Sequence, residues 1–213
     1  IGPDNIDIVF NELDALVNVD LNTREIKENH TALNIVRIGT SGSLQADIPV
    51  DSWVMSKYAI GLDNMLRSYL IEEHSVSELE DAFIAQTNWD LRKGRPTVVP
   101  CAEALENKIY SNKFHKGFTG TAGGFYGPQG RVVRLNIQDP QLNSKMDAFN
   151  YNGTRMTNLE METSAIYGLG KLLGHNCLSL NAIIANRAVG EFSSNPEKTV
   201  NELIAYTLDK LVE

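Results

Sequence analysis

The segment 124–131 brings together three side chains that can hold a flat heterocycle. The ring of Phe125 can pack against such a ring, the carboxamide of Gln129 offers a donor and an acceptor, and Arg131 offers only donors. This set matches the edge of uracil, which reads acceptor, donor, acceptor. The glycines and the proline of the segment predict a tight turn that projects both polar side chains the same way. The alternative is an ordinary surface turn.

A second polar segment, residues 37–42, reads Arg-Ile-Gly-Thr-Ser-Gly and is expected where a buried strand gives way to a loop. A guanidinium, two hydroxyls and the backbone amides beside the glycines predict an oxyanion or phosphate site. No Gly-Lys-Ser or Gly-Lys-Thr closes the segment, so it is not a P-loop. The alternative is a structural arginine in a strand-to-turn connection. Because its neighbours are apolar, that arginine still needs a partner, and a bound phosphate would be one.

Residues 159–165 cross from a predicted strand into a predicted helix and contain two carboxylates. A carboxylate at this junction can accept hydrogen bonds from vicinal hydroxyls, so Glu162 is a candidate for binding a ribose. The alternative is that Glu162 only favours the first turn of the helix through its dipole. A glycosidase-like pair with Glu160 is disfavoured, because residues two apart at such a junction need not face each other. Asn186 and Arg187 add polar groups after another predicted strand.

The composition is that of one soluble globular domain, predicted to span residues 1–213. The hydrophobic content of 42% is ordinary, and the length is enough to bury one substantial core. The formal net charge of -8 predicts no nucleic-acid partner, because phosphate neutralisation needs clustered Lys and Arg. The sequence has no apolar run of bilayer length and no secretory signal. We therefore expect no membrane partner and a cytoplasmic location.

Metal and thiol chemistry is not expected. The four histidines have no metal-ligand spacing, so no metal site is predicted. Cys101 and Cys177 are expected to be small buried residues in a reducing compartment. The chain begins at Ile1 without an initiator Met and enters a helix almost at once. We expect that an upstream segment is missing.

Alternating strand and helix patterns predict an α/β fold. Apolar residues at helical spacing predict helices over residues 6–17, 64–71, 77–86, 102–110, 142–149, 162–173 and 196–212. Strands are expected over residues 33–38, 53–60, 116–122, 156–161 and 176–185. This order predicts a three-layer α/β domain with its function in loops beyond the strand ends.

Several local signals refine this pattern. Ser77 and Glu80 have the spacing of a capping box, and Asn195 is suited to cap the last helix. The glycine-rich run over residues 117–124 predicts close packing between strands, with a nucleotide loop as the alternative.

The three polar segments together resemble those of the nucleoside phosphorylase family. Segments 37–42 and 160–162 (Glu-Met-Glu) are similar across that superfamily, whereas Phe-Tyr-x-x-Gln-x-Arg over residues 125–131 resembles uridine phosphorylases in particular. The resemblance covers nearly the whole chain. It implies a three-layer αβα sandwich around a mixed, strongly twisted central sheet.

The resemblance also implies a role for each matching residue. The phosphate-binding residues implied are Arg37, Gly39 and Thr40. The base-binding residues implied are Phe125, Gln129, Arg131 and Arg187. The ribose-binding residues implied are Met161 and Glu162, with Glu160 supporting the pocket. Of these, Arg37, Thr40, Gln129, Arg131 and Glu162 are expected to carry catalysis.

The activity implied is phosphorolysis of a pyrimidine nucleoside in nucleoside salvage. Uridine and inorganic phosphate would give uracil and ribose 1-phosphate, a pentosyl transfer that needs no cofactor. Purine enzymes of the family place an Asp after the last core strand, whereas residues 185–188 here read Ala-Asn-Arg-Ala. The missing acid disfavours a purine leaving group, which needs a proton donor there.

Two features depart from the family pattern. Pro128 precedes Gln129 where the family usually has Gly, and the N-terminal region that supplies a second phosphate loop is absent. The resemblance further implies a homodimer or a hexamer of dimers, with an Arg and a His contributed across subunits. The alternatives are a purine phosphorylase or nucleosidase of the same fold, or a nucleoside-binding fragment without catalysis.

Overall fold

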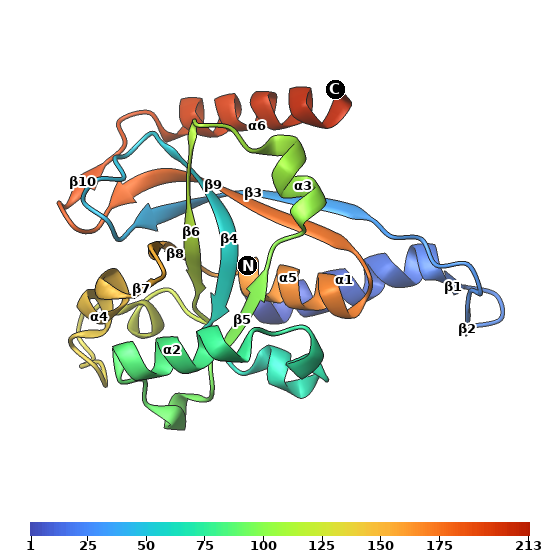
Figure 1. Ribbon diagram of the computed structural model, residues 1–213, viewed down its shortest axis with the longest axis horizontal. Helices are drawn as coiled ribbons and strands as arrows, with labels where there is room; N and C mark the ends of the chain where they lie inside the picture. Colours follow the sequence, from blue (N-terminus) through green and yellow to red (C-terminus); the bar gives the residue numbers. More distant parts are fainter.

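A mixed eight-stranded sheet forms the centre of the structure, a computed structural model that describes residues 1–213 (Figure 1). Its strands are β3 (Asn34–Ser43), β4 (Trp53–Gly61), β5 (Thr97–Pro100), β6 (Phe114–Thr121), β7 (Asn150–Tyr151), β8 (Thr154–Glu160), β9 (Asn176–Asn186) and β10 (Glu191–Phe192). They lie in the order β10-β9-β3-β8-β6-β4-β5, with β7 paired to β8. Strand β9 also pairs with β4, so the twisted sheet curves far enough to close through these two strands.

Neighbouring strands of this sheet run in both directions. The pairs β3–β9, β4–β6 and β6–β8 are parallel, and the pairs β3–β8, β4–β5 and β4–β9 are antiparallel. Parallel neighbours require crossover connections, which the helices supply. The mixed, twisted central sheet is therefore confirmed.

Six helices cover both faces of the sheet. They are α1 (Pro3–Asn18), α2 (Ser77–Thr87), α3 (Glu103–Ile109), α4 (Leu142–Ala148), α5 (Thr163–Leu172) and α6 (Pro196–Val212). Helices α1, α3, α5 and α6 pack with β4 and β9 around a core of 21 buried residues, including Tyr167 and Leu203. Helices α2 and α4 enclose a second core of 12 buried residues, which includes Phe118 and Met156 from the strands. This arrangement confirms the three-layer αβα architecture.

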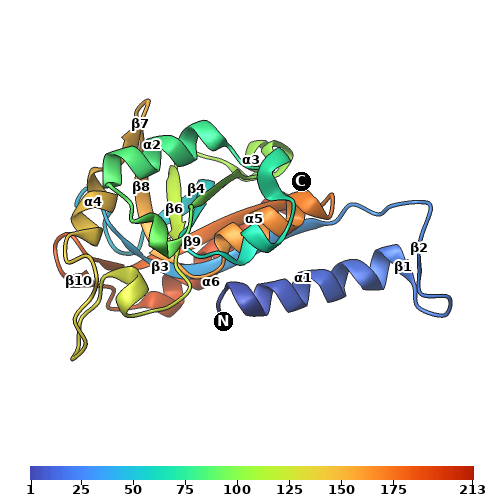
Figure 2. The same ribbon diagram turned by 90° about the horizontal axis from the view of Figure 1, so that it is seen from below.

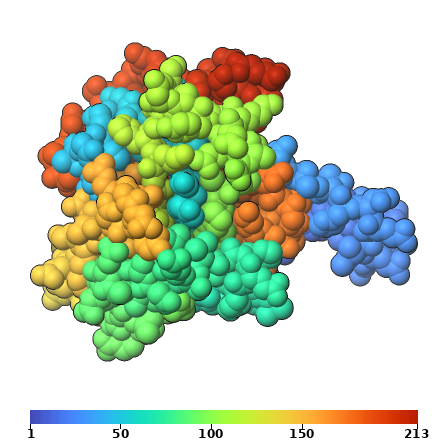
Figure 3. All heavy atoms as spheres, viewed as in Figure 1, coloured from blue at the N-terminus to red at the C-terminus, as the bar shows by residue number.

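Shorter elements complete the chain. The 3-10 turns are η1 (Met65–Ser68), η2 (Ile71–Glu73), η3 (Leu91–Lys93) and η4 (Gly127–Gln129). A hairpin of β1 (Val19–Asp20) and β2 (Glu25–Ile26) follows α1. Together with the end of α1 it projects away from the sheet, as Figures 2 and 3 show from two directions. No helix of the structure has both the length and the apolar character needed to span a membrane.

The prediction that residues 39–42 belong to a loop is wrong. Strand β3 continues to Ser43 and pairs with β9 throughout, with a register shift after Ser41. The glycines indicated a turn, but here they make room for arginine side chains. A Cβ on Gly39 would lie 2.4 Å from the Arg37 guanidinium, and one on Gly42 would lie 3.2 Å from Arg187.

The predicted capping box and the predicted helix 64–71 are also wrong. Ser77 is the first residue of α2, and Val76 occupies the cap position without a side-chain hydrogen bond. The buried carboxylate of Glu80 instead forms ion pairs with Arg67 and Arg95, each at 2.8 Å. Residues 64–71 form η1 and the start of η2 in place of an α-helix. Strand β5 was not predicted, because it is only four residues long and ends in proline.

Other local predictions are confirmed. The side chain of Asn195 accepts a hydrogen bond from the backbone N–H of Lys198 and caps α6. Gly117 and Gly120 permit close strand packing, since added Cβ atoms would lie 2.4 Å from the Arg155 carbonyl oxygen and 2.5 Å from the Leu159 side chain. Both cysteines are free and buried.

Candidate active site

Arg37 lies in β3, where four side chains surround its guanidinium. Nη2 donates to Glu162 Oε2 at 2.7 Å and lies 3.3 Å from Glu160 Oε2. Nη1 donates to Asn181 Oδ1 at 2.9 Å and to Ser179 Oγ at 3.4 Å. The partner that this partly buried arginine needs is therefore a pair of carboxylates. The contact of Arg37 with Glu162 joins segments 37–42 and 159–165 directly.

Glu160 supports the start of α5. Its carboxylate accepts hydrogen bonds from the backbone N–H groups of Glu162 and Thr163, each at 2.9 Å, and from Thr121 Oγ1 at 2.6 Å. These bonds satisfy donors that a helix N-terminus leaves free and place negative charge at the positive end of its dipole. Glu160 is thus anchored, while Glu162 directs its carboxylate to Arg37. This geometry fits the supporting place that the resemblance implies for Glu160.

Thr40 and Met161 lie where β3 crosses β8. Gly42 pairs with Leu159 in antiparallel register, which brings residues 39–42 alongside residues 159–162. Thr40 is exposed, and Met161 is half-buried. Both therefore lie at the same crossing as the Arg37–Glu162 pair, although neither makes a side-chain hydrogen bond.

Segment 124–131 forms the predicted tight turn. Its centre is η4, followed by Gly130 with a φ of 71°, a left-handed conformation that favours glycine. Pro128 occupies the first turn of η4, and its ring packs closely against Gly124, where a Cβ would lie 2.9 Å away. Pro128 is therefore compatible with the turn.

Gln129 is the point where this turn meets the end of β9. Its side chain is buried, and Oε1 accepts hydrogen bonds from Arg131 Nη1 at 2.7 Å and Arg187 Nη2 at 2.6 Å. Arg187 Nη1 also donates to the Gln129 backbone carbonyl at 3.0 Å. Phe125 is 51% exposed, and the Arg131 guanidinium lies 3.8 Å above its ring. The structure thus brings all four predicted base-binding residues together.

This cluster, Phe125 with Gln129, Arg131 and Arg187, is cationic. Burial and, to a smaller extent, the neighbouring charge of Arg131 together lower the pKa of the Arg187 guanidinium to about 10. Burial also lowers the pKa of Arg131. Both arginines remain protonated at neutral pH, and their acceptor is a neutral amide rather than a carboxylate. The cluster therefore suits a polar ring on which negative charge develops.

The cationic cluster lies beside the Arg37 site. Arg187 packs against Gly42, which pairs with Leu159 just before Glu160. The turn itself leaves the end of β6, which is parallel to β8 and ends at the same edge. The Arg37 site and the cationic cluster therefore lie at one edge of the sheet, where α/β proteins place their functional groups.

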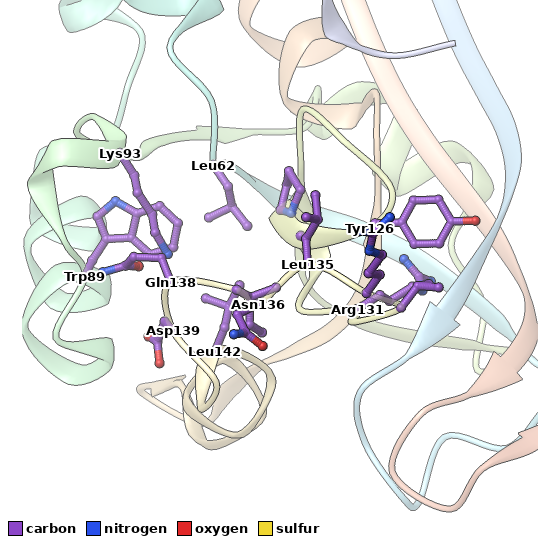
Figure 4. Close-up of a pocket in the computed structure, with 15 residues that line it drawn as sticks. Leu62, Trp89, Lys93, Tyr126, Arg131, Leu135, Asn136, Gln138, Asp139 and Leu142 are labelled. Carbon is purple, nitrogen blue, oxygen red and sulfur yellow. The ribbon is translucent and has the colours of Figure 1, made fainter.

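A cavity of about 710 Å³ lies behind the turn (Figure 4). Its lining runs from Trp89 and Lys93 at one end, past Leu62, to Tyr126 and Arg131 at the other. Arg131 is the one residue of the predicted site that lines it, whereas the polar groups of β3, β8 and β9 lie outside. The sequence-predicted site and this cavity are different places that share one arginine.

Asn181 and Ser179 are site residues that the sequence analysis did not identify. Both are fully buried on β9 and carry no charge, and they belong to no recognisable sequence motif. The available signal was their spacing, because two polar residues at alternate positions of an apolar strand share one face. That face is the one directed at Arg37.

The side chain of Asn186 has a structural role and does not join the cationic cluster. Its Nδ2 donates to the backbone carbonyls of Gln45 and Ile48, at 2.9 and 2.8 Å. Its Oδ1 accepts from the backbone N–H groups of Ala188 and Val189. All of its hydrogen-bonding capacity is used by the backbone around Arg187.

We expect Asn186→Asp to lower the free energy of unfolding by about 3 kcal/mol, because a carboxylate oxygen would face two carbonyl oxygens. Urea denaturation at neutral pH measures this change. Asn22→Asp, at an exposed position of the hairpin, is the matched control and should leave stability unchanged. An unaltered unfolding free energy for Asn186→Asp would contradict these hydrogen bonds.

The ionisation of Glu162 makes stability depend on pH. Burial alone would raise its pKa, but hydrogen bonds from the backbone nitrogens of Ile1 and Gly2, together with Arg37, outweigh it and lower the pKa below the ordinary 4.5. A lowered folded-state pKa stabilises the protein fully above the unfolded-state value, and this contribution is lost as pH falls through the folded-state pKa. We expect the free energy of unfolding to fall below pH 4.5. Urea denaturation across this range should show a shallower pH dependence for Glu162→Gln, and identical slopes would refute the assignment.

Comparisons with known proteins identify relatives over most of the chain. A uridine phosphorylase from Thermococcus kodakarensis is 27% identical over 170 residues, which are 76% of this chain and 52% of that protein. A DeoD-type purine nucleoside phosphorylase from Tolumonas auensis is 25% identical over 193 residues, 89% of this chain and 68% of that protein. The chain therefore spans about half the length of the first of these relatives.

Solved structures of nucleoside phosphorylases also resemble this chain. A Trypanosoma brucei nucleoside phosphorylase, described as showing uridine phosphorylase activity, has a TM-score of 0.85 and 26% identity, covering 100% of this chain and 77% of that one. A uridine phosphorylase from Phytophthora capsici shares the fold with a TM-score of 0.62 at 20% identity, covering 100% and 72%.

The fold and the site define an α/β protein that gathers polar side chains at the ends of strands from one sheet. The family model of the phosphorylase superfamily matches residues 1–213. The chain belongs to the phosphorylase superfamily, which confirms the family resemblance.

Proposed function

We propose that the protein catalyses phosphorolysis of uridine, converting uridine and inorganic phosphate to uracil and ribose 1-phosphate. The observation that carries this proposal is the convergence of Arg131 and Arg187 on Gln129, without a carboxylic acid in the cluster. Donors of this kind stabilise a uracil anion through its carbonyl oxygens. Gln129 Nε2 makes no hydrogen bond to the protein, so it offers a further donor to the base.

The proposed reaction needs no side-chain nucleophile. A phosphate oxygen, held by Arg37 with Gly39 and Thr40, forms a bond to C1′ as the C1′–N1 bond breaks. The electron pair of that bond passes to uracil, which then takes a proton. Glu162 accepts hydrogen bonds from the ribose hydroxyls, beside Met161. Positioning and electrostatic stabilisation supply the rate enhancement.

The Arg37–Glu162 ion pair supports this arrangement. Because one guanidinium contacts the ribose-binding carboxylate directly at 2.7 Å, phosphate bound to Arg37 would lie close to the sugar. Glu160 holds the start of α5 and thereby the orientation of Glu162. The uridine phosphorylases among the relatives from Thermococcus and Trypanosoma also support a pyrimidine nucleoside as substrate.

The second candidate is phosphorolysis of a purine nucleoside, which the DeoD-type relatives favour. A purine leaving group is best protonated by an acid near the base. Residues 185–188, where the family resemblance places that acid, include no Asp or Glu, and the side chain of Asn186 is committed to backbone groups. The pyrimidine substrate is therefore the better proposal.

Kinetics with two nucleosides test the proposal. At saturating phosphate, we expect kcat/KM for uridine to exceed that for inosine. Preference for inosine would overturn the pyrimidine assignment. Uridine binding by calorimetry without formation of ribose 1-phosphate would favour a nucleoside-binding fragment instead.

Gly39 offers a test that leaves the fold intact. In Gly39→Ala the added Cβ would lie 2.4 Å from Arg37 Nη1, the end of a flexible side chain, so the guanidinium moves and the backbone stays. We expect the KM for phosphate to rise about tenfold, as for one lost hydrogen bond to a charged group, with the KM for uridine unchanged. Steady-state kinetics with either substrate varied measure both values. An unaltered KM for phosphate would separate Gly39 from the phosphate site.

Assembly, location and cofactor use stay predictions. We propose a homo-oligomer, either a homodimer or a hexamer of dimers, that works in the cytoplasm without a cofactor. Sedimentation of the purified protein measures the oligomeric state.

A further inference from the structure

A chain of buried polar side chains crosses the interior of the closed sheet. Asn181, Ser56, Thr119 and Asn158 come from four different strands, and all are fully buried. Asn181 Nδ2 donates to Ser56 Oγ at 3.3 Å, and the Ser56 and Thr119 hydroxyl oxygens lie 2.5 Å apart. Thr119 Oγ1 in turn donates to Asn158 Oδ1 at 2.8 Å.

The contact with Arg37 fixes the orientation of the Asn181 amide. A guanidinium only donates, so the Asn181 atom that faces it is the carbonyl oxygen. The amide nitrogen then faces Ser56 Oγ and donates to it.

The position of Asn181 on β9 also allows it to hold the Arg37 guanidinium. It pairs with Gly39 across the parallel β3–β9 ladder, and the guanidinium lies directly over Gly39. Arg37 is therefore held between Asn181 on one side, at 2.9 Å, and Glu162 on the other, at 2.7 Å. Without Asn181, only the longer contact with Ser179 Oγ, at 3.4 Å, opposes the attraction of the two carboxylates, and the guanidinium would move toward them.

We propose that Asn181 is a positioning residue for phosphate binding, which keeps the Arg37 guanidinium in place against the pull of Glu160 and Glu162. This inference rests on the proposed function. Asn181 does not contact the substrate, and it acts only through Arg37.

Two substitutions of Asn181 distinguish a role in positioning Arg37 from a role in stabilising the fold. Asn181→Ala removes the acceptor, and we expect the KM for phosphate to rise about tenfold, as for one hydrogen bond to a charged group. Asn181→Asp keeps the shape and the acceptor but adds a negative charge beside Arg37, which repels phosphate. We expect its KM for phosphate to rise further than that of the Ala variant, by about another threefold or more. A purely structural role predicts the reverse order, because Asp is the closer replacement.

Asn158→Ala is the matched control. Asn158 has the same residue type and burial and belongs to the same chain, but it makes no contact with Arg37. We expect it to lower the melting temperature while leaving the KM for phosphate within about twofold of wild type. In all three variants the KM for uridine should stay nearly constant.

The experiment is steady-state kinetics of the purified protein and its variants, with phosphate and uridine varied in turn, together with thermal melting. A raised KM for phosphate in both Asn181 variants, in the order Asp above Ala, supports the inference. An unchanged KM for phosphate, or equal changes in Asn181→Ala and Asn158→Ala, overturns it. Because Asn181→Asp is isosteric, it carries the test if the Ala variant does not fold. Absence of uridine phosphorolysis by the wild-type protein would contradict the proposed function instead.

Discussion

Arg37→Ala is expected to lower kcat/KM for phosphate by about 100- to 1000-fold, the range found when a donor to developing negative charge is removed. The effect should be large because the guanidinium is the one cation in contact with both Glu160 and Glu162. Its removal takes the phosphate ligand away and leaves two carboxylates without a counter-charge. Uridine affinity should change less, because the base cluster on Gln129 is untouched.

Kinetics with phosphate and uridine varied separately measure this difference. Arg155→Ala is the matched control, because Arg155 forms an ion pair with Asp47 on the surface, away from the site. We expect that variant to retain wild-type kinetics. Equal losses for phosphate and uridine in Arg37→Ala would refute the assignment of Arg37 to phosphate.

Gln129→Leu is expected to have the opposite profile. The substitution keeps the buried volume but removes the carbonyl oxygen that accepts from Arg131 and Arg187, leaving two positive charges without their shared acceptor. We expect the KM for uridine to rise about 100-fold. The site loses the hydrogen bonds of Gln129 to the base, and the two arginines lose the acceptor that holds them in place. The KM for phosphate should remain unchanged.

A second glutamine serves as the control for this result. Gln138 lines the cavity behind the turn and lies outside the Gln129 cluster. Gln138→Leu should therefore leave the KM for uridine as it is. If Gln138→Leu impaired uridine use and Gln129→Leu did not, the base would bind in the cavity.

Sequence patterns predicted the helices and long strands well, because their apolar periodicity reports burial directly. The turn at Gln129 was equally legible, since Gly130 has the positive φ that the glycines indicated. The end of β3 was not, because Gly39 and Gly42 there accommodate side chains rather than a turn. At Gly39 that side chain is Arg37 of the same strand, and at Gly42 it is Arg187, which follows β9.

Contacts between distant segments account for what the sequence could not predict. The hydrogen bond from Arg37 to Asn181 links positions 144 residues apart and exists only because β3 and β9 are parallel neighbours. Arg187 and Gln129 are 58 residues apart, and nothing local to either indicates their contact. The residue types indicated which chemistry is possible, but the register of the sheet decides which side chains come into contact.

A structure with uracil and ribose 1-phosphate bound tests the central claim most directly, because these are the two products of the proposed reaction. The account predicts the phosphate within hydrogen-bond distance of Arg37, the ribose hydroxyls on Glu162, and the edge of uracil on Gln129 with Arg131 and Arg187. Uracil bound instead in the cavity beside Trp89, or phosphate bound away from Arg37, would contradict it.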